Sequence, residues 1–143
     1  MKTMLSYRRQ LRIEWGDCDP AGIVFYPRYF AMFDHNTTML ISTASGMTKP
    51  QLLKHYDFAG YPVLSTQAKF MIPNTFGDEV EIESAFTRVG RSSFEIRHVM
   101  TKNGAIAVEA QEARAWVKAS AEDKTKIKSH PLPEDLAAKF RGE

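Results

Sequence analysis

One stretch of the sequence decides the fold, and it runs Trp15-Gly16-Asp17-Cys18-Asp19-Pro20-Ala21-Gly22-Ile23-Val24-Phe25-Tyr26-Pro27. Its two acids and its turn-forming residues separate two apolar segments, one alternating like a strand and one with helical spacing. The proline at its end suits the first position of a helix. The sequence therefore predicts a strand that delivers two carboxylates to a helix N-terminus. Because the free N–H groups of a helix start attract negative charge, we interpret this stretch as a candidate active-site loop.

The segments on either side of the loop predict a strand and a long helix. From Tyr7 to Trp15, apolar and charged side chains alternate, which places on one face Leu11, Ile13 and Trp15. From Pro27 to Ser45, residues suited to a buried stripe fall three or four apart, at Phe30, Phe33, Thr37 and Leu40 or Ile41. Gly46 then supplies a helix stop.

The middle of the chain predicts a shorter helix and then strands. Weaker helical spacing spans Lys49 to Tyr56, Gly60-Tyr61-Pro62 breaks it, and the apolar run from Val63 to Ile72 is a candidate strand. The clearest strand runs from Asp78 to Thr87, because its apolar residues alternate with three glutamates. Gly90 marks the turn that follows this strand.

The last third of the chain contains one ambiguous segment. Ser93 to Met100 alternates like a strand, and Asn103-Gly104 is a strong hairpin signal. Ala105 to Lys118 leaves two interpretations open, because its composition favours helix whereas its alternation after a hairpin favours strand. Ala119 to Glu143 is a polar, charged tail in which Pro133 to Phe140 is a candidate short helix. A long helix against an antiparallel sheet is an α+β architecture.

Length and composition narrow the class of protein. A chain of 143 residues with 43% apolar residues fits one domain with a modest core. A formal charge of +2 without a dense basic block argues against a nucleic-acid partner. Cys18 is the only cysteine, which excludes an internal disulfide and suits a reducing compartment. The sequence shows neither a secretory signal nor an apolar stretch that could cross a bilayer, so we expect a cytoplasmic protein with no membrane partner.

The loop also carries a family resemblance. The motif from Asp17 to Val24, continued by Tyr26-Pro27 and Tyr29, resembles the 4-hydroxybenzoyl-CoA thioesterases of the hot-dog fold. In that branch of the fold, the catalytic aspartate lies on this loop. The resemblance extends more loosely through Tyr61 to Ser65 and Arg91 to Phe94, so it covers most of the chain.

The resemblance implies an architecture and an assembly. It predicts a single hot-dog domain over residues 1–143, with a curved antiparallel sheet of about five strands wrapped around the long helix. It also decides for a strand over Ala105 to Lys118. Hot-dog proteins pair edge to edge, so we expect a homodimer that assembles to a homotetramer. Their active sites lie at the dimer interface, and a monomer would hold only half a site.

The resemblance assigns the catalytic roles within the loop. Asp19 matches the family's catalytic carboxylate, and the backbone N–H of Tyr26 lies where the family polarises the thioester carbonyl. Asp17 matches as well, but we assign it a loop-structuring role. From the residues alone, both acids of an Asp-Pro turn could equally be turn formers and helix caps.

Two further groups of residues are expected to bind substrate. The predicted substrate-binding residues are Asp34, Tyr61, Pro62, Val63 and Ser65. The predicted CoA-binding residues are Arg88, Gly90, Arg91 and Ser92, with Arg97 close to the same turn. Gly90 and Ser92 stand where members of the family carry further basic residues, so part of the phosphate clamp is missing or supplied differently. The basic tail residues that could compensate are Lys124, Lys126 and Lys128.

We predict neither a metal nor a cofactor. Two acids one residue apart invite a metal, because hard cations bind oxygen ligands. However, the four histidines are scattered, and the sequence has no HxxxH pair and no Cys/His cluster. Cys18 lies between two acids that disfavour its thiolate, so we predict a structural role for it.

The function expected from the resemblance is hydrolysis of an acyl-CoA thioester, most simply an aromatic one such as 4-hydroxybenzoyl-CoA. Asp19 would act as nucleophile or general base. One alternative is a thioesterase for short aliphatic acyl-CoA or acyl carrier protein. The other is a non-catalytic module that binds acyl-CoA. Asp19 discriminates between the classes, because a pure binder has no use for an acid beside a thioester.

Overall fold

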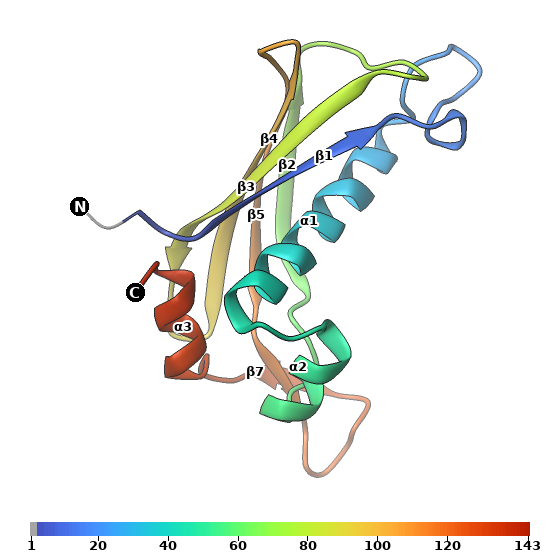
Figure 1. Ribbon diagram of the computed structural model, residues 1–143. Coiled ribbons are helices and arrows are strands. Elements are labelled where there is room, and N and C mark those ends of the chain that lie inside the picture. Colours follow the sequence, from blue (N-terminus) through green and yellow to red (C-terminus); the bar gives the residue numbers. More distant parts are fainter. Residues whose placement is uncertain (1–2) are drawn as a thin grey trace.

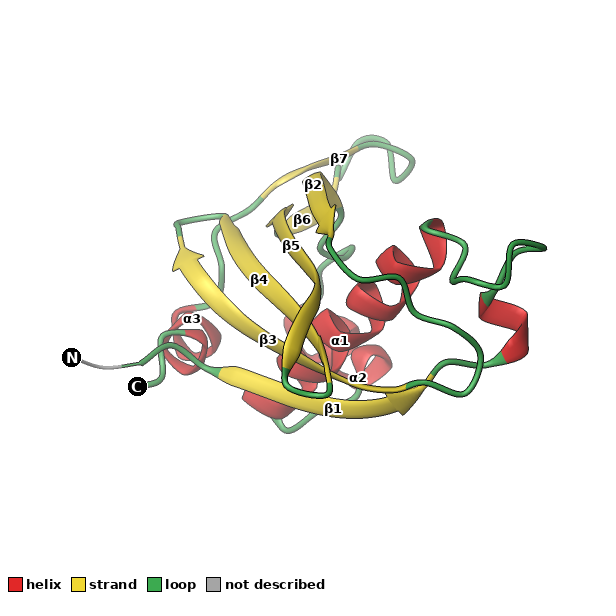
Figure 2. Cartoon of the chain, turned by 90° about the horizontal axis from the view of Figure 1, so that it is seen from above, coloured by secondary structure: helices red, strands yellow, loops and turns green. Residues whose placement is uncertain are grey.

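The computed structural model describes residues 3–143, which form a five-stranded antiparallel sheet with a long helix against it and a small two-stranded sheet. The strands of this sheet lie in the order β1-β3-β4-β5-β2, with β1 and β2 at its edges (Figure 2). Their bounds are β1 Ser6–Arg12, β2 Val63–Phe70, β3 Glu79–Val89, β4 Ser93–Lys102 and β5 Ala105–Ala115. Helix α1, Pro27–Ser45, crosses one face of the sheet (Figure 1). The predicted α+β class and five-stranded sheet are confirmed.

Both N-terminal helices begin and end where the sequence predicts. Pro27 occupies the first turn of α1, and Gly46 ends it in the left-handed conformation with φ of 70°. Helix α2, Lys49–Tyr56, starts at a capping box in which Thr48 and Gln51 each accept a backbone N–H of the other. Within residues 3–143, every helix is too short or too polar to span a lipid bilayer.

Strand β1 is shorter than predicted, which corrects the position of Trp15. The strand ends at Arg12, and Trp15–Asp17 form one turn of 3₁₀ helix. The Asp17 carboxylate accepts the N–H of Glu14 at 2.9 Å, and this local bond takes that N–H away from strand pairing. Trp15 is therefore 70% exposed, rather than packed beside Ile13 as the alternation predicts.

The segment with a helical composition is a strand. Asn103 and Gly104 both have positive φ, 51° and 80°, as a tight two-residue hairpin requires. The turn brings β5 beside β4, and β2 pairs with the other edge of β5. Hydrogen bonding on both sides outweighs the intrinsic helix preference of its alanine and glutamate residues.

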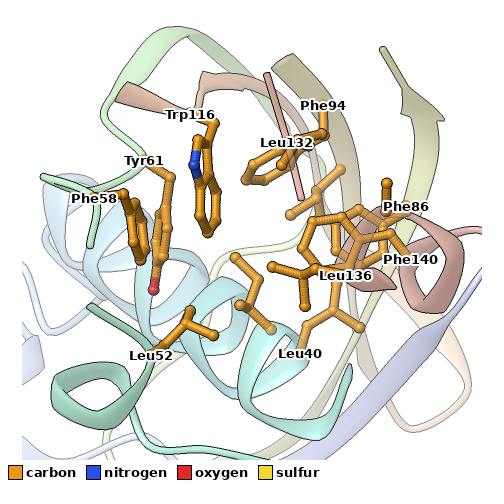
Figure 3. Packing of buried hydrophobic residues seen from close by; sticks show 13 residues of the cluster. Leu40, Leu52, Phe58, Tyr61, Phe86, Phe94, Trp116, Leu132, Leu136 and Phe140 are labelled. Carbon is orange, nitrogen blue, oxygen red and sulfur yellow. The ribbon is translucent and has the colours of Figure 1, made fainter. Parts of the chain in front are cut away.

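The C-terminal segment contributes to the core, contrary to its description as a polar tail. It contains β6 Val117–Ala119, its partner β7 Ile127–Ser129, and helix α3 Glu134–Phe140. Leu132, Leu136 and Phe140 are buried and lie four residues apart, so they form one stripe (Figure 3). Phe140 stacks on Phe86 of β3 with ring centroids 4.1 Å apart. The spacing of these three apolar residues, four apart in a mostly charged segment, is the sequence feature that would have indicated a buried helix face.

Two hydrophobic clusters fill the space between α1 and the sheet. The first lies near the N-terminus of α1 and includes Phe33, Ile82, Met100 and Val108. The second lies near its C-terminus and α3, and includes Leu40, Phe86, Phe94 and Trp116 (Figure 3). The first cluster underlies the loop from Trp15 to Pro27 and holds its base in place.

Candidate active site

The loop between β1 and α1 is closed by backbone hydrogen bonds between its two arms. Phe25 N–H donates to the carbonyl of Asp17 at 2.8 Å, and Asp19 N–H donates to that of Ile23 at 2.9 Å. Val24 N–H donates to the carbonyl of Asn74 at 2.9 Å, which ties the loop to the β2–β3 connection. The loop is thus a braced hairpin that brings the segment around Asp19 next to the start of α1.

The two acids of the loop face different partners. Asp17 accepts the Glu14 N–H through Oδ2, so its carboxylate closes the 3₁₀ turn. Asp19 accepts the Ala21 N–H at 2.8 Å through Oδ1. No donor within residues 3–143 reaches the second oxygen of Asp19. Asp17 therefore braces the loop, whereas Asp19 keeps one carboxylate oxygen available for a substrate or a water.

A free backbone donor lies at the start of α1. Tyr26 precedes the helix with helical dihedral angles, φ −53° and ψ −34°, and Pro27 after it has no N–H. Among the described residues, none accepts a hydrogen bond from the Tyr26 N–H. The Tyr26 side chain is 61% exposed, and its ring meets that of Phe70 edge-on at 6.4 Å. The N–H is thus available to an oxygen that gains negative charge.

Cys18 is a poor nucleophile in this loop. Burial and the neighbouring carboxylates of Asp17 and Asp19 raise the pKa of its thiol above the ordinary value. Its Sγ also contacts the carbonyl of Glu14 at 3.7 Å. The part of the chain that the structure describes holds no group of three or more His, Cys, Asp or Glu side chains placed to bind a metal.

A small cavity of about 50 Å³ lies between α1 and β2, and we call it the α1–β2 cavity. Its lining consists of Phe30, Phe33 and Val63 with the polar residues Asp34, Thr66, Glu112 and Arg114. The ring of Phe70 meets those of Phe30 and Tyr26, so aromatic side chains connect the cavity with the start of α1. Two of the predicted substrate-binding residues, Asp34 and Val63, therefore meet here.

The other predicted substrate-binding residues lie elsewhere. Tyr61 is 3% exposed and its ring belongs to the core, where the hydroxyl lies 3.1 Å from that of Thr38 (Figure 3). Pro62 is exposed beside it. Ser65 pairs with Ala113, on the face of the sheet turned away from α1. The hydrogen-bond partner of the Asp34 side chain within residues 3–143 is Arg114, with which it forms an ion pair at 2.7 Å, rather than Tyr26 or the loop.

A row of polar side chains, buried in the middle and more exposed at its ends Arg9 and Asp34, separates the two hydrophobic clusters, and sequence reasoning missed it. We call it the polar belt, and its members are Arg9, Asp34, Asn36, Thr37, Ser84, His98, Glu112 and Arg114. His98 bonds to Ser84 through Nδ1 at 2.6 Å and to Glu112 through Nε2. Continuing the alternation of β5 past Ala110 would have placed Glu112 and Arg114 on the inner face.

Contacts within the belt keep Glu112 ionised. Its side chain is buried, and burial by itself would raise the pKa of the carboxyl. The hydrogen bond and charge of His98, the charge of Arg114 and the hydroxyl of Thr37 outweigh that effect and hold the pKa of Glu112 below its ordinary value. The charged form of Glu112 is therefore the one that suits the folded protein.

The predicted CoA-binding residues lie at the turn between β3 and β4, with Arg88 near the end of β3 and Gly90, Arg91 and Ser92 in the turn itself. Arg88 and Arg91 have exposed side chains, and neither is ion-paired with any residue in 3–143. The Arg88 guanidinium packs over Gly90, and a side chain at this position would begin 3.5 Å from it. Ser92 contributes a carbonyl that accepts the N–H of Trp116 at 2.9 Å. Arg97 is away from the turn, paired with Glu109 on the outer face.

This turn and the loop of Asp19 lie at opposite ends of the molecule (Figure 1). Strand β3 has 11 residues and connects the two ends. At about 3.3 Å per residue, the separation is roughly 35 Å. The lysines of the β6–β7 region lie at the end with the turn. One protomer therefore does not bring the two predicted parts of the site together.

The family model for the thioesterase superfamily matches residues 21–108. The 4-hydroxybenzoyl-CoA thioesterase of Pseudomonas sp. (strain CBS-3) is 32% identical over 97 residues, which are 68% of this chain and 69% of that protein. The 1,4-dihydroxy-2-naphthoyl-CoA hydrolase of Synechococcus elongatus is 26% identical over 133 residues, 93% of each chain.

The fold also resembles solved structures. A mutant 4-hydroxybenzoyl-CoA thioesterase in complex with 4-hydroxybenzoyl-CoA superimposes with a TM-score of 0.85 at 28% identity, over 95% of this chain and 99% of that one. A gentisyl-coenzyme A thioesterase gives a TM-score of 0.80 at 26% identity, over 94% and 99%. The chain therefore belongs to the thioesterase superfamily, and its curved sheet and long helix form the hot-dog fold.

Proposed function

We propose that this protein hydrolyses an acyl-CoA thioester to the free acid and CoA. The observation that carries the proposal is the pair of unused groups on one braced loop, the second oxygen of Asp19 and the N–H of Tyr26. A thioester carbonyl needs an electron-pair donor at carbon and a hydrogen-bond donor at oxygen. These two groups supply both at a helix N-terminus.

Asp19 performs one of two steps in the proposed reaction. As a general base, it takes a proton from water while the water oxygen bonds to the acyl carbon, and the C–S bond then breaks. As a nucleophile, its oxygen bonds to the acyl carbon, CoA leaves as thiolate, and water cleaves the anhydride. In both routes, the Tyr26 N–H stabilises the carbonyl oxygen and the CoA thiolate takes up a proton.

An aromatic acyl group such as 4-hydroxybenzoyl fits this site best. Two of the relatives are named for aromatic acyl-CoA substrates, 4-hydroxybenzoyl-CoA and 1,4-dihydroxy-2-naphthoyl-CoA, and aromatic rings line the path from Tyr26 to the α1–β2 cavity. Stacked or edge-on contacts with Phe30 and Phe70 would hold a ring there. Asp34 stands at the far end of the cavity, where it would contact the acyl group.

The CoA phosphates are proposed to bind Arg88 and Arg91 of a second protomer. β2 is an edge strand with large exposed apolar side chains, namely Val63, Leu64, Phe70 and the adjacent Met71. Such an edge needs cover. Antiparallel pairing of two β2 strands brings the Arg91 turn of one protomer toward the Asp19 loop of the other. We therefore propose a homodimer with shared sites, which assembles to a homotetramer.

A steady-state hydrolysis screen tests the proposal. The purified protein is offered aromatic and short aliphatic acyl-CoA thioesters, and release of the CoA thiol is followed with a thiol reagent. We expect turnover, with the largest kcat/KM for an aromatic acyl group. A preference for aliphatic acyl groups would replace the aromatic assignment. Tight binding without turnover of any thioester would overturn the enzymatic proposal in favour of a binding module.

A further inference from the structure

Asn74 is a buried polar residue in the connection between β2 and β3, and it contacts three other parts of the molecule. Its backbone carbonyl accepts the N–H of Val24, in the Asp19 loop, at 2.9 Å. Its side-chain nitrogen Nδ2 donates to the hydroxyl of Tyr29 in α1 at 3.0 Å and lies 3.4 Å from the sulfur of Met100 in β4. One residue therefore joins the loop, the first turn of the long helix and the sheet.

The burial of the Asn74 side chain is unfavourable for stability. Asn74 is fully buried, and its Oδ1 is the one buried side-chain oxygen or nitrogen within residues 3–143 that has no hydrogen-bond partner there. Buried polar atoms in folded proteins are almost always paired, because an unpaired one loses its hydration without compensation. A residue that breaks this rule is expected where its geometry serves function rather than stability.

The connection that carries Asn74 is itself fixed to the sheet. Lys102, at the end of β4, donates to the carbonyl of Pro73 at 2.9 Å and forms an ion pair with Asp78 at 3.0 Å. The Asp78 carboxylate also accepts the N–H of Thr75 at 2.8 Å. These bonds hold the connection on both sides of Asn74, so it is a fixed support for the loop and for the helix.

This support lies next to both groups of the proposed catalytic pair. On the loop side, the carbonyl of the residue before Val24 accepts the N–H of Asp19 at 2.9 Å. On the helix side, the N–H of Tyr29 donates to the carbonyl of Tyr26 at 3.1 Å. The spacing between the Asp19 carboxylate and the Tyr26 N–H therefore depends on how the loop and the helix are held against the β2–β3 connection.

We infer that Asn74 is a positioning residue for the proposed reaction, and that its bond to Tyr29 sets the start of α1 against the Asp19 loop. This inference rests on the proposed thioesterase function. Because Asn74 is fully buried, it acts through the loop and the helix and not by contact with the substrate. A misplacement of about 1 Å can slow an enzyme about 100-fold, so a small change in spacing lowers kcat without weakening binding.

Asn74→Ala tests the inference, because it removes the side-chain amide and keeps the backbone bond to Val24. We expect kcat for the best acyl-CoA substrate to fall about 10-fold to 100-fold, while KM changes less than about threefold. The midpoint of thermal unfolding should stay within about 5 °C of the wild type, since the lost hydrogen bond and the removed unpaired oxygen offset each other. Tyr29→Phe keeps the ring and removes the same bond, so its kcat should fall as well.

Asn36→Ala is the matched control, because Asn36 is also a fully buried asparagine but its side chain bonds to Arg9 and Ser84, away from the loop. Both polar atoms of Asn36 are paired, so this variant should lower the unfolding midpoint by more than about 5 °C and leave kcat unchanged. The same pattern in Asn74→Ala, lost stability with unchanged kcat, would show a purely structural role and overturn the inference.

A second measurement shows whether Asn74 acts through Asp19. In an Asp19→Asn chain, the further change Asn74→Ala should lower kcat by less than about twofold, because the carboxylate to be positioned is already gone. A full further loss there would overturn the inference, and so would a wild-type kcat in Tyr29→Phe. A wild-type protein that hydrolyses no acyl-CoA thioester would instead overturn the proposed function, so the two failures are distinguishable.

Discussion

Asp17 and Asp19 are separated by one residue and carry the same charge, but they accept hydrogen bonds from different parts of the loop. Asp17 turns back to Glu14 and closes a 3₁₀ turn, whereas Asp19 is held through one oxygen by Ala21. The resemblance assigned the catalytic role to Asp19 and the bracing role to Asp17, and this assignment remains a proposal with which the hydrogen bonds are compatible. Without the geometry, either acid was equally suited to capping a turn.

Arg91 carries a prediction at the scale of the residue. Its exposed guanidinium has no ion-pair partner in residues 3–143 and is proposed to bind a CoA phosphate. Arg91→Ala should raise KM for the acyl-CoA by about tenfold, the effect of losing one charge-assisted hydrogen bond, with little change in kcat. The wild-type KM should also rise with salt. Arg97→Ala is the control. A KM unchanged in Arg91→Ala would remove Arg91 from the site.

At the scale of the element, the sequence predicted the features that neighbouring residues determine. It did not predict those that depend on residues far away in the chain. Helix α1 was predicted to the residue, because its proline start, its periodic apolar face and its glycine stop are all local. Strand β1 was predicted too long, because the capping role of Asp17 competes with strand pairing. The polar belt was missed, since a buried glutamate is understood only when its partners are known, and those of Glu112 lie on α1, on β4 and further along its own strand.

Helix α3 was predicted as a helix, but its place in the core could not be predicted from a mostly charged segment. Phe140 is fully buried between Phe86 and Phe94. Phe140→Ala should therefore lower the free energy of unfolding by about 3–5 kcal/mol, as is usual for a buried phenylalanine. Lys139→Ala, on the exposed side of the same helix, should change it by less than about 0.5 kcal/mol. Urea unfolding of both variants measures this, and equal midpoints would show that α3 is not part of the core.

The polar belt predicts how stability depends on pH. The pKa of Glu112 is lower in the folded protein than its ordinary value of 4.5. Its ionised form therefore contributes stability that is fully present above pH 4.5 and is lost as the pH falls through the lower, folded pKa. Glu112→Gln should be less stable at neutral pH and should lose stability less steeply below about pH 4.5. Thermal unfolding between pH 3 and 7 measures both, and a slope equal to that of the wild type would contradict this role.

At the scale of the whole molecule, the two predicted parts of the site are separated by the length of the sheet. The Asp19 loop lies beyond one end of β3 and the Arg91 turn beyond the other (Figure 1). The proposed two-fold pairing through β2 would overcome this separation, because it would place the Arg91 turn of each protomer beside the Asp19 loop of its partner. Light scattering should show a dimer or tetramer at micromolar concentration. A fully active monomer would contradict the shared site.

Complementation between two defective variants tests the shared site directly. In a heterodimer of Asp19→Asn and Arg91→Ala chains, one of the two sites combines an intact Asp19 from one chain with an intact Arg91 from the other. Co-expressed and co-purified through two tags, this heterodimer should regain about half of the wild-type kcat/KM. Each parent alone should stay low at limiting substrate. No gain above the parents would place both residues in the same site of one protomer.

The most direct test of the central claim is kcat of Asp19→Asn at saturating substrate. The amide keeps the oxygen that accepts from Ala21 and removes the charge, so the loop should stay folded. We predict a loss in kcat of ~10²–10⁴, the range for a positioned acid–base group, or more if Asp19 is the nucleophile. Binding of the thioester should persist, and Asp17→Asn should lose less. A folded Asp19→Asn protein that hydrolyses the best substrate at the wild-type rate would contradict the proposed mechanism.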